Sequence, residues 1–477
     1  MSRPDAIVIG AGFAGLSAAV RLVQGGARVL VVEERRRLGG RATAFADPQS
    51  GEVVDNGQHA LFGCYHETFD FLRAIGTYEQ VALDERLDIE IVDRRASRSR
   101  LVTPQWTPPL HLVGGLLRWS ALGLRDRVAA LRMGHVLRQL ARHATDATWT
   151  RLGRQTAESW LIECGQTPRL RELLWEPLVV AALNQAPATA AAAPFARVLA
   201  RMFNGTRSDA AIGLPRVPLD ALYAEPARTW LEARGSSVLT GTTATLAVDA
   251  GRAIGVDLRD RRIEAGAVVS SVPWFSFPAL VQGNDELGTL SQHASRMAAS
   301  PIVTVNLWYD RSVTDTAFVG LPGRTFQWVF DKGRIIGGAT SHLSLVSSGA
   351  DAVVALSNDQ LVALAHEEVA AALPGARGAT VQRGVVVREK RATFSLAPGQ
   401  PPRPGAATPV RGFFLAGDWT DTGLPSTIEG AVESGHRAAL LVLAAHLTPG
   451  TSHPAPGTEH EAPHPAPGTR HPARSGS

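Results

Sequence analysis

Cysteine is scarce in this chain of 477 residues, which contains only Cys64 and Cys164, 100 positions apart. Without a CxxC pair or a Cys/His cluster, the sequence excludes a disulfide-stapled scaffold and a cysteine-based metal site. We therefore expect two buried, reduced thiols in a cytoplasmic protein, and no bound metal.

Long apolar runs and a strong excess of one charge are also absent. No stretch reaches about 18 apolar residues, so we expect no transmembrane helix. The N-terminal MSRPDAIVIGAG reaches its first predicted strand within five residues, which leaves no room for a secretory signal. The net charge is only +4 and the arginines are spread along the chain. This disfavours nucleic acid as a partner and allows peripheral contact with the inner face of the cytoplasmic membrane.

A glycine-rich turn near the N-terminus carries the first functional signal. It lies between a buried strand and a helix, and a second buried strand follows. Gly10, Gly12 and Gly15 have the G-x-G-x-x-G spacing that permits a tight turn, close approach of a pyrophosphate and close helix packing. The helix N-terminus offers free N–H groups to the phosphates. Glu33 and Glu34 end the second strand, where an acid binds a ribose hydroxyl, so the segment predicts a dinucleotide site.

A second motif distinguishes FAD from NAD. Gly39, Gly40 and Arg41 follow the two acids closely. A glycine pair lets the chain run beside the pyrophosphate, and the arginine can neutralise its charge. This GGR extension resembles that of the FAD-dependent amine oxidase and phytoene desaturase superfamily; a basic surface turn is the alternative.

A third motif lies near the C-terminus. The stretch FFLAGDWTDTGLPSTIEG, residues 413–430, resembles the C-terminal FAD motif of the same superfamily. The resemblance implies that Gly417 and Asp418 bind FAD. It also implies that Thr427 and Ile428 begin a helix beneath the flavin.

The resemblance implies an α/β fold, with a Rossmann-like FAD-binding domain of the GR2 flavoprotein type and an inserted α+β substrate domain. Residues 265–273, AGAVVSSVP, resemble the strand that re-enters the FAD domain; an ordinary sandwich strand is the alternative. Periodicity also predicts strands over 301–309 and 325–339 and a helix over 359–375. The predicted domains are 1–85, 236–285 and 385–447 for FAD, 86–235 and 286–384 for substrate, and a disordered low-complexity tail at 448–477.

Longer stretches narrow the family. VVDNGQHALFGCYHET (53–68), LLWEPLVVAALNQAP (173–187) and IGLPRVPLDALYAEPARTWLEARG (212–235) resemble the hydroxysqualene dehydroxylases, also called squalene-associated FAD-dependent desaturases. The resemblance implies an FAD-dependent oxidoreductase that removes the hydroxyl of hydroxysqualene reductively, giving squalene for hopanoid synthesis. It implies a hydrophobic triterpene substrate and other enzymes of squalene synthesis as partners, and leaves the electron donor open.

Two alternatives keep the flavin and change the chemistry. One is a desaturase of a carotenoid-type isoprenoid, and the other is an amine oxidase. Only four tyrosines occur in the chain, and Trp419 is the one aromatic cage candidate near the C-terminal motif, which argues against an amine substrate. A flavoprotein that holds FAD without catalysis is a third alternative.

The loop Asp55-Asn56-Gly57-Gln58-His59 supplies the catalytic candidates. Hydroxide is a poor leaving group, so dehydroxylation needs a general acid or a hydrogen-bond donor. His59 and Asp55 are the candidates for that role, and Gly57 permits backbone contact with the cofactor. A structural or FAD-contacting role, or a surface position, is the alternative for His59.

Residues 106–141 combine Trp, Leu and Arg. This composition is typical of an interfacial amphipathic segment that could take a lipid-like substrate from a membrane. The alternative is a buried face of the substrate domain, and both interpretations hold if these helices form the mouth of a tunnel.

Overall fold

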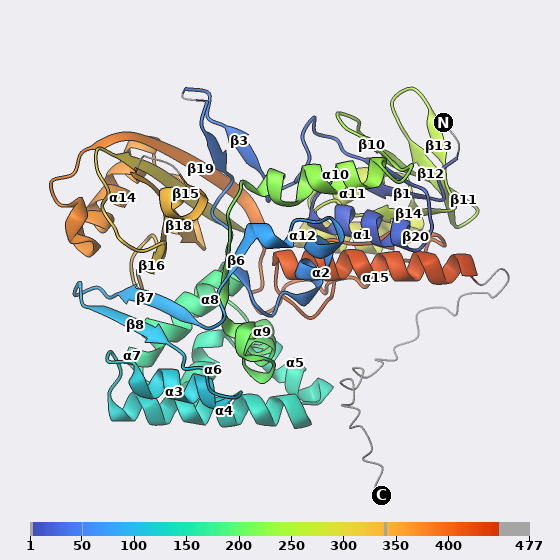
Figure 1. Cartoon of the computed structure of the whole chain (residues 1–477). Coiled ribbons are helices and arrows are strands. Elements are labelled where there is room, and N and C mark those ends of the chain that lie inside the picture. The colour runs from blue at the N-terminus through green and yellow to red at the C-terminus, as the bar shows by residue number, and fades with distance from the viewer. Residues whose placement is uncertain (1–2, 50, 338–340, 448–477) are drawn as a thin grey trace, which may run out of the picture.

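The first strand of the chain lies at the centre of a parallel sheet (Figure 1). The computed structural model describes residues 3–49, 51–337 and 341–447, so the predicted tail lies outside the described residues. All neighbouring strands of this sheet are parallel. In spatial order they are β10 (Ser237–Leu239), β2 (Val29–Val32), β1 (Ala6–Ile9), β14 (Ala267–Ser270) and β20 (Phe413–Leu415).

Other elements cover this sheet, because a parallel sheet is buried on both faces. Helix α1 (Phe13–Gln24) packs against α15 (Ile428–Leu447) and α10 (Glu225–Glu232). An antiparallel sheet packs through β12 against β14. Its strands are β11 (Thr245–Asp249), β12 (Arg252–Asp257) and β13 (Arg262–Glu264). We call these elements together the parallel-sheet part.

A second, seven-stranded sheet lies beside the parallel-sheet part (Figure 1). Helix α14 (Asn358–Ala372) packs on one face, against an apolar layer that includes Val303, Val305 and Leu343. Alternate residues of the same strands, among them Thr304 and Asn306, face the other way. The strand order is β19 (Val381–Phe394), β15 (Ala299–Tyr309), β18 (Ser341–Ser348), β17 (Trp328–Asp331), β16 (Phe318–Gly320), β7 (Asp88–Val92) and β8 (Arg98–Val102).

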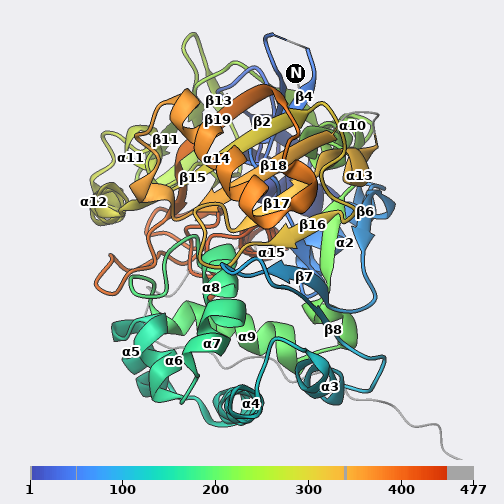
Figure 2. The same ribbon diagram turned by 90° about the vertical axis from the view of Figure 1, so that its left-hand side faces the viewer.

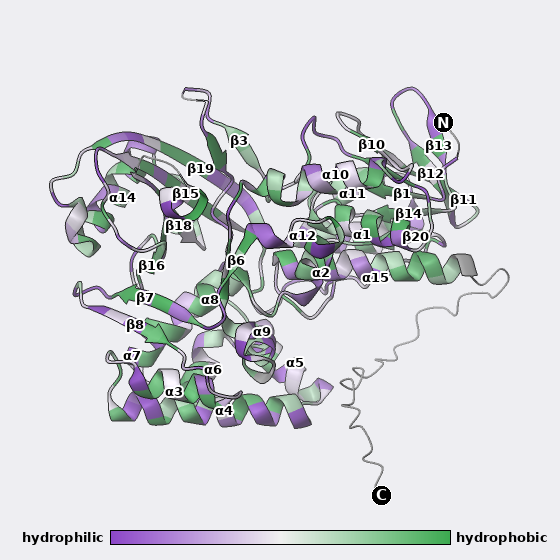
Figure 3. Ribbon diagram, viewed as in Figure 1, coloured by the Kyte–Doolittle hydropathy of each residue, from purple (hydrophilic) through white to green (hydrophobic). Residues whose placement is uncertain are grey.

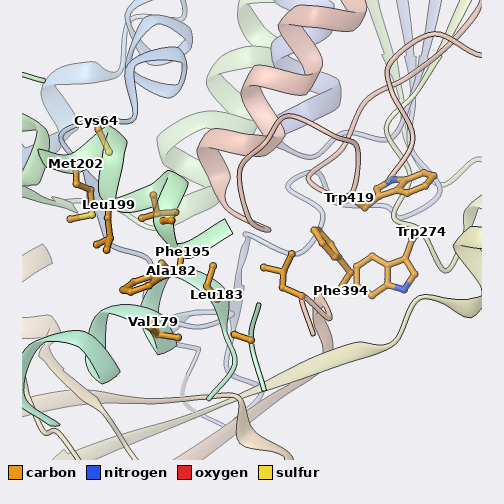
Figure 4. Packing of buried hydrophobic residues seen from close by; sticks show 14 of the residues in the cluster. Cys64, Val179, Ala182, Leu183, Phe195, Leu199, Met202, Trp274, Phe394 and Trp419 are labelled. Atoms are coloured by element: carbon orange, nitrogen blue, oxygen red, sulfur yellow. The ribbon is translucent and has the colours of Figure 1, made fainter. Parts of the chain in front are cut away.

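A group of helices packs below the two sheets (Figure 2). These helices are α3 (Leu110–Arg118), α4 (Leu124–His143), α5 (Asp146–Arg154), α6 (Ala157–Glu163), α7 (Pro168–Leu170), α8 (Glu176–Leu183) and α9 (Ala192–Asn204). Their core is continuous with that of the parallel-sheet part. Figure 4 shows this continuity, with Phe195 and Leu199 of α9 in the same cluster as Trp274 and Trp419.

Smaller elements connect these parts. Two short sheets pair β3 with β4 and place β9 between β5 and β6. The strands are β3 (Ala44–Ala46), β4 (Val53–Asp55), β5 (Leu61–Phe62), β6 (Val81–Leu83) and β9 (Ile212–Pro215), and the helices are α2 (His66–Ala74), α11 (Phe277–Leu280), α12 (Gly288–Arg296) and α13 (Lys332–Ile336). In the described residues, no helix is both long and apolar enough to cross a membrane.

The strand–helix–strand unit at the N-terminus is confirmed, and so is the re-entry of residues 265–273, because β14 pairs with both β1 and β20. The expectation of continuous strand over 325–339 is wrong. There β17 ends at Asp331 and the short helix α13 follows. The Asp331 carboxylate accepts a hydrogen bond from the backbone N–H of Arg334 at 3.2 Å, which caps this helix.

The predicted domain boundaries stay predictions, although one strand crosses a boundary and one helix packs against the domain on the other side. Strand β19 runs over Val381–Phe394 without a break, across the predicted boundary at 385. Helix α10, predicted to belong to the substrate domain, packs on α1 and β10 of the parallel-sheet part. Contacts of α10 with the parallel-sheet part are therefore the reason why this helix lies there.

Candidate functional site

The glycine turn leaves open space above the N-terminus of α1. Gly10 has a φ of +103°, which favours glycine, and its N–H donates to the carbonyl of Val32 at 2.8 Å. A Cβ on Gly15 would lie 2.0 Å from the carbonyl oxygen of Gly10, so only glycine fits there. A Cβ on Gly12 would meet only the Cα of Gly40, at 4.0 Å. No side chain caps this helix, whose first N–H groups can therefore bind an anion.

Glu33 lies at the end of β2 beside this turn. Its carboxylate is 8% exposed and accepts hydrogen bonds from the backbone N–H groups of Ala11 at 2.8 Å and Arg35 at 2.9 Å. Glu34 is exposed. Of the two predicted ribose-binding acids, Glu33 therefore has the position that the turn requires.

The GGR segment lies directly against the turn. The N–H of Gly39 donates to the carbonyl of Ala11 at 2.9 Å, and a Cβ on Gly40 would lie 3.4 Å from the Cα of Gly12. Both glycines of the pair have positive φ, +102° and +58°. The hydroxyl of the buried Tyr223, which lies just before α10 in the chain, donates a hydrogen bond to the carbonyl of Gly39 at 2.7 Å. This bond connects the GGR segment to the start of α10.

Arg41 joins the two ends of the chain. Its Nη2 donates to Oδ1 of Asp418 at 2.5 Å, and its Nη1 donates to the carbonyl of Ala392 at 2.7 Å. The guanidinium also lies 5.5 Å from the ring centre of Trp274. The hydroxyl of Ser426 donates to the other Asp418 oxygen. The two predicted cofactor residues Arg41 and Asp418 are thus brought into contact.

The C-terminal motif forms a turn followed by α15. Gly417 has a φ of +122°, and its N–H donates to the Ser434 hydroxyl at 2.8 Å. The Thr427 hydroxyl accepts from the N–H of Gly430 at 3.1 Å and caps α15, which begins at Ile428. The predicted strand–loop–helix order of this motif is present.

Residues 53–59, which comprise β4 and the loop that follows it, are called the 53–59 loop and contribute one member of a buried ion pair that the sequence did not reveal. Oδ2 of Asp55 accepts from Nζ of Lys332 at 2.7 Å, and both side chains are 8% exposed. Lys332 also donates to Oε1 of Gln58 at 2.6 Å. Oδ1 of Asp55 accepts from the N–H of Leu219 at 3.1 Å. Asp55 is therefore the partner of Lys332 in an ion pair, and its role as the acid stays a prediction.

Gly57 and His59 lie in the same loop. Nδ1 of His59 lies 2.9 Å from the carbonyl oxygen of Gly57, so the neutral imidazole donates from Nδ1 and keeps Nε2 as an acceptor. Burial lowers the pKa of His59, which makes the neutral form dominant at pH 7. A Cβ on Gly57 would lie 3.4 Å from Oγ1 of Thr304 in β15, so the loop meets the second sheet. Asn56 donates to the carbonyl of Arg41 at 2.9 Å and fastens the loop to the GGR segment.

The second sheet offers further polar groups near Lys332. Oδ1 of Asn306 lies 2.9 Å from Nε2 of His342, whose ring stacks on Trp308 with 4.0 Å between ring centres. Burial, and then the charge of Lys332, lower the pKa of His342 to about 3. Nδ2 of Asn306 is buried and has no hydrogen-bond partner within the described ranges. A buried donor without a partner is costly, so this amide suits a bound polar group.

A cavity of about 20 Å³ adjoins the C-terminal motif, room for roughly one water. The carboxylate of Glu429 lies on its wall, accepts from the N–H groups of Glu67 and Thr68, and has its pKa raised by burial. The other lining residues are Phe62, Cys64, Tyr65, Ala182, Val198, Arg201, Leu424, Pro425 and Thr427. Side chains from α8 and α9 therefore meet the C-terminal motif here.

Both cysteines are free. Cys64 is buried, as expected, and burial raises the pKa of its thiol to about 12. Cys164 is only half-buried, so the expectation of two buried thiols is wrong for this residue. It lies at the C-terminal end of α6, whose outer side faces solvent.

Several site residues were missed in the sequence. Lys332 and Lys390 are the only two lysines of the chain, and this scarcity is a signal that could have drawn attention to Lys332. Tyr223, Ser434 and Asn306 carry no such signal. Their roles depend on contacts between distant segments, which local patterns do not encode.

These features define a dinucleotide-binding oxidoreductase of the flavoprotein class. The open space over Gly12, the uncapped N-terminus of α1, the buried acid at the end of β2 and the Arg41–Asp418 pair fit an FAD with a pyrophosphate and hydroxylated ribose and ribityl groups. The individual cofactor contacts stay predictions.

The chain belongs to the family of flavin containing amine oxidoreductases, whose family model matches residues 13–443. Membership implies FAD as cofactor and makes the protein an FAD-dependent oxidoreductase of the amine oxidase and carotenoid desaturase superfamily. Among solved structures, cyclohexylamine oxidase from Brevibacterium oxydans has a TM-score of 0.67 and 18% identity, and the match covers 94% of this chain and 100% of that one. This likeness shows the same mixed α/β fold.

Three curated relatives are similar over most of their length. The hydroxysqualene dehydroxylase of Rhodopseudomonas palustris is 33% identical over 92% of this chain and 98% of its own. That of Sinorhizobium fredii is 30% identical over 91% and 97%. The zeta-carotene desaturase of Solanum lycopersicum is 25% identical over 91% of this chain and 80% of its own.

Replacing Arg41 or Asp418 tests the cofactor assignment. Arg41→Ala and Asp418→Ala should each weaken FAD binding at least roughly tenfold, since a lost hydrogen bond to a charged group costs about 1.5–3 kcal/mol. The ratio of flavin to protein absorbance after purification, and titration of the apoprotein with FAD, measure the effect. Arg36→Ala, at an exposed arginine of the same segment, is the control. Normal flavin occupancy in both site variants would contradict the assignment.

Proposed function

We propose that this flavoenzyme is a hydroxysqualene dehydroxylase, which replaces the allylic hydroxyl of hydroxysqualene by hydrogen and releases squalene and water. Two relatives at 33% and 30% identity, aligned over nearly their whole length, bear that name. The stretches 53–68, 173–187 and 212–235 that resemble this family include the 53–59 loop, α8 and α10, respectively. These segments surround the candidate site.

The observation that carries the proposal is the buried Lys332–Asp55 pair beside His59. Removing two charges from water is costly, and an apolar site would have no reason to retain them. A hydrocarbon substrate offers nothing for an ammonium group to bind. A hydroxylated one offers an oxygen, which must leave as water.

The chain's own residues meet the needs of this reaction. Bound in its reduced form, FAD supplies the hydride. Lys332 donates a hydrogen bond to the departing oxygen, and Asp55 keeps its ammonium in place. His59, when protonated, delivers the proton that turns the leaving hydroxide into water. The Nδ2 group of Asn306 is a further donor for the substrate oxygen.

Apolar residues exclude water from the reacting part of the substrate. Loss of the hydroxyl leaves an allylic cation, which the side chains around the C-terminal motif keep from water. The cavity at this motif is lined mainly by apolar side chains of the 62–65 segment, α8 and α9. Helices α8 and α9 therefore supply mainly apolar walls, and, among their described residues, Arg201 is the one charged side chain that they contribute to the lining of this cavity.

A carotenoid-type desaturase is the second candidate. The similarity to zeta-carotene desaturase over 91% of the chain supports it. Such an enzyme would oxidise a hydrocarbon and would have no use for the Lys332–Asp55 pair. The two candidates therefore differ in the direction of electron flow.

A redox assay separates the two candidates. Dithionite-reduced holoenzyme mixed with hydroxysqualene without oxygen should regain its oxidised flavin spectrum, and squalene should appear by mass spectrometry. Phytoene and an aliphatic amine, offered to the oxidised enzyme, serve as controls and should leave the flavin oxidised. Flavin reduction by phytoene, with no reoxidation by hydroxysqualene, would contradict the proposed function.

Neutralising the buried pair tests the role of Lys332. The double variant Lys332→Met with Asp55→Asn should keep flavin and fold, because both charges disappear together. Its single-turnover rate should fall at least roughly a hundredfold if the donor assists the leaving group. Lys390→Met, at the one other lysine of the chain and an exposed one, should leave the rate unchanged. A double variant as fast as the parent would exclude this role.

The pH profile tests His59. Since burial lowers its pKa, the fraction of protonated His59 is small at pH 7 and grows as the pH falls. The single-turnover rate should rise from pH 7.5 to about 5.5 in the parent enzyme and stay flat in His59→Gln. Bound flavin is measured in both. An unchanged profile in the variant would place His59 among the structural contacts, and loss of flavin would place it among the cofactor contacts.

A further inference from the structure

Exposed apolar side chains gather at one end of the molecule. Ten large apolar side chains are exposed within the described ranges, and six of them lie between positions 106 and 131. Monomeric surfaces carry such residues singly, so a cluster marks an interaction site. The six are Trp106, Leu110, Leu117, Leu124, Val128 and Leu131.

The cluster follows the outer faces of α3 and α4. Leu110 and Leu117 are seven residues apart on α3, and Leu124, Val128 and Leu131 follow i, i+4, i+7 spacing on α4. The inner face of α4 is buried through other residues, such as Met133 and Leu137. The two helices lie together at the end of the molecule remote from the parallel sheet (Figures 1 and 2), and apolar and polar residues alternate along α4 (Figure 3).

The same segment carries the positive charge of the protein. Residues 106–143 contain six arginines and one acidic residue, Asp126, a net charge of +5 in a chain whose total is +4. The rest of the chain is therefore close to neutral. Five of these arginines are exposed and form no ion pair within the described ranges: Arg118, Arg125, Arg132, Arg138 and Arg142.

Aromatic and basic groups also meet here. The guanidinium of Arg118 lies 5.1 Å from the ring centre of Trp106, a residue that is 46% exposed. Trp and Arg with exposed Leu are the side chains that settle at the boundary between lipid headgroups and acyl chains. A protein partner would need no such uniform positive charge.

We propose that the α3–α4 face, formed by the exposed side chains of residues 106–143, docks on the surface of an anionic phospholipid bilayer. The arginines contact the lipid phosphates, and the leucines and Trp106 enter the interface. This binding does not depend on the proposed dehydroxylation.

The docking face lies one helix away from the candidate site. Helix α9 packs against α4 on one side, and its residues Val198 and Arg201 line the cavity at the C-terminal motif. A lipid that leaves the bilayer at the α3–α4 face therefore needs to pass only this layer of helices. The sequence allowed residues 106–141 to be either an interfacial amphipathic segment or a buried face of the substrate domain. Both interpretations apply, because one face of α3 and of α4 is buried and the opposite face is exposed.

Vesicle sedimentation tests the proposal. Full-chain holoenzyme should bind phosphatidylcholine vesicles that contain phosphatidylglycerol, and bind pure phosphatidylcholine vesicles much more weakly. Leu117→Asp should lower the partition coefficient at least roughly tenfold. Arg125→Gln with Arg132→Gln should lower it by roughly fivefold per arginine at low salt, and high salt should remove that difference.

The matched control is Leu440→Asp on α15, because Leu440 is 51% exposed and Leu117 is 46% exposed. The control should bind vesicles like the parent, and all variants should keep their flavin and thermal midpoint. Equal binding to both vesicle types, or undiminished binding by Leu117→Asp, would overturn the proposal. Light scattering shows whether the parent is a dimer that Leu117→Asp converts to a monomer. If so, and if vesicle binding is unchanged, the α3–α4 face is a contact between two copies of the chain, and the proposal is overturned.

Discussion

The contacts of Arg41 hold the candidate site together. Its side chain binds Asp418 and the carbonyl of Ala392, and its own carbonyl accepts from Asn56. These partners lie 377, 351 and 15 positions away along the chain. A single guanidinium has enough donors in one plane to bind several acceptors at once, which an ammonium group cannot match geometrically. The glycine turn, the C-terminal motif, the end of β19 and the 53–59 loop therefore meet at one residue.

Local motifs predicted the half of the site that holds a dinucleotide. The glycine spacing, the acid after β2 and the strand–loop–helix at the C-terminus are short patterns, and a parallel sheet brings their ends to one edge. The Lys332–Asp55 pair could not be predicted in this way, because its members are 277 positions apart. Moreover, Lys332 lies in α13, a segment that the sequence pattern predicted to be a strand. It forms a helix instead, whose N-terminus is capped by Asp331. Which residues pair between such distant segments depends on how the segments pack, and sequence spacing does not record this packing.

The two halves of the site differ in polarity for a physical reason. The parallel-sheet half offers backbone N–H groups and an arginine, which suit a charged cofactor. The half formed by β15, β18 and α13 offers one buried ion pair and neutral donors within apolar surroundings. In such surroundings each hydrogen bond is stronger than in water, and each unpaired group is more costly. This distribution is the reason for the proposed substrate, which has a single oxygen on a long hydrocarbon.

The order of strands in the parallel sheet also bears on biosynthesis. The strand that is synthesised first, β1, needs β14 as its neighbour, and β14 needs β20 near the end of the described chain. A nascent chain therefore exposes the unpaired edge of β1 until β14 has left the ribosome, and the unpaired edge of β14 until β20 has followed it. Contacts of such long sequence separation form slowly and leave intermediates prone to aggregation. The contact between Arg41 and Asp418 in the candidate site can consequently form only after residue 418 has been synthesised.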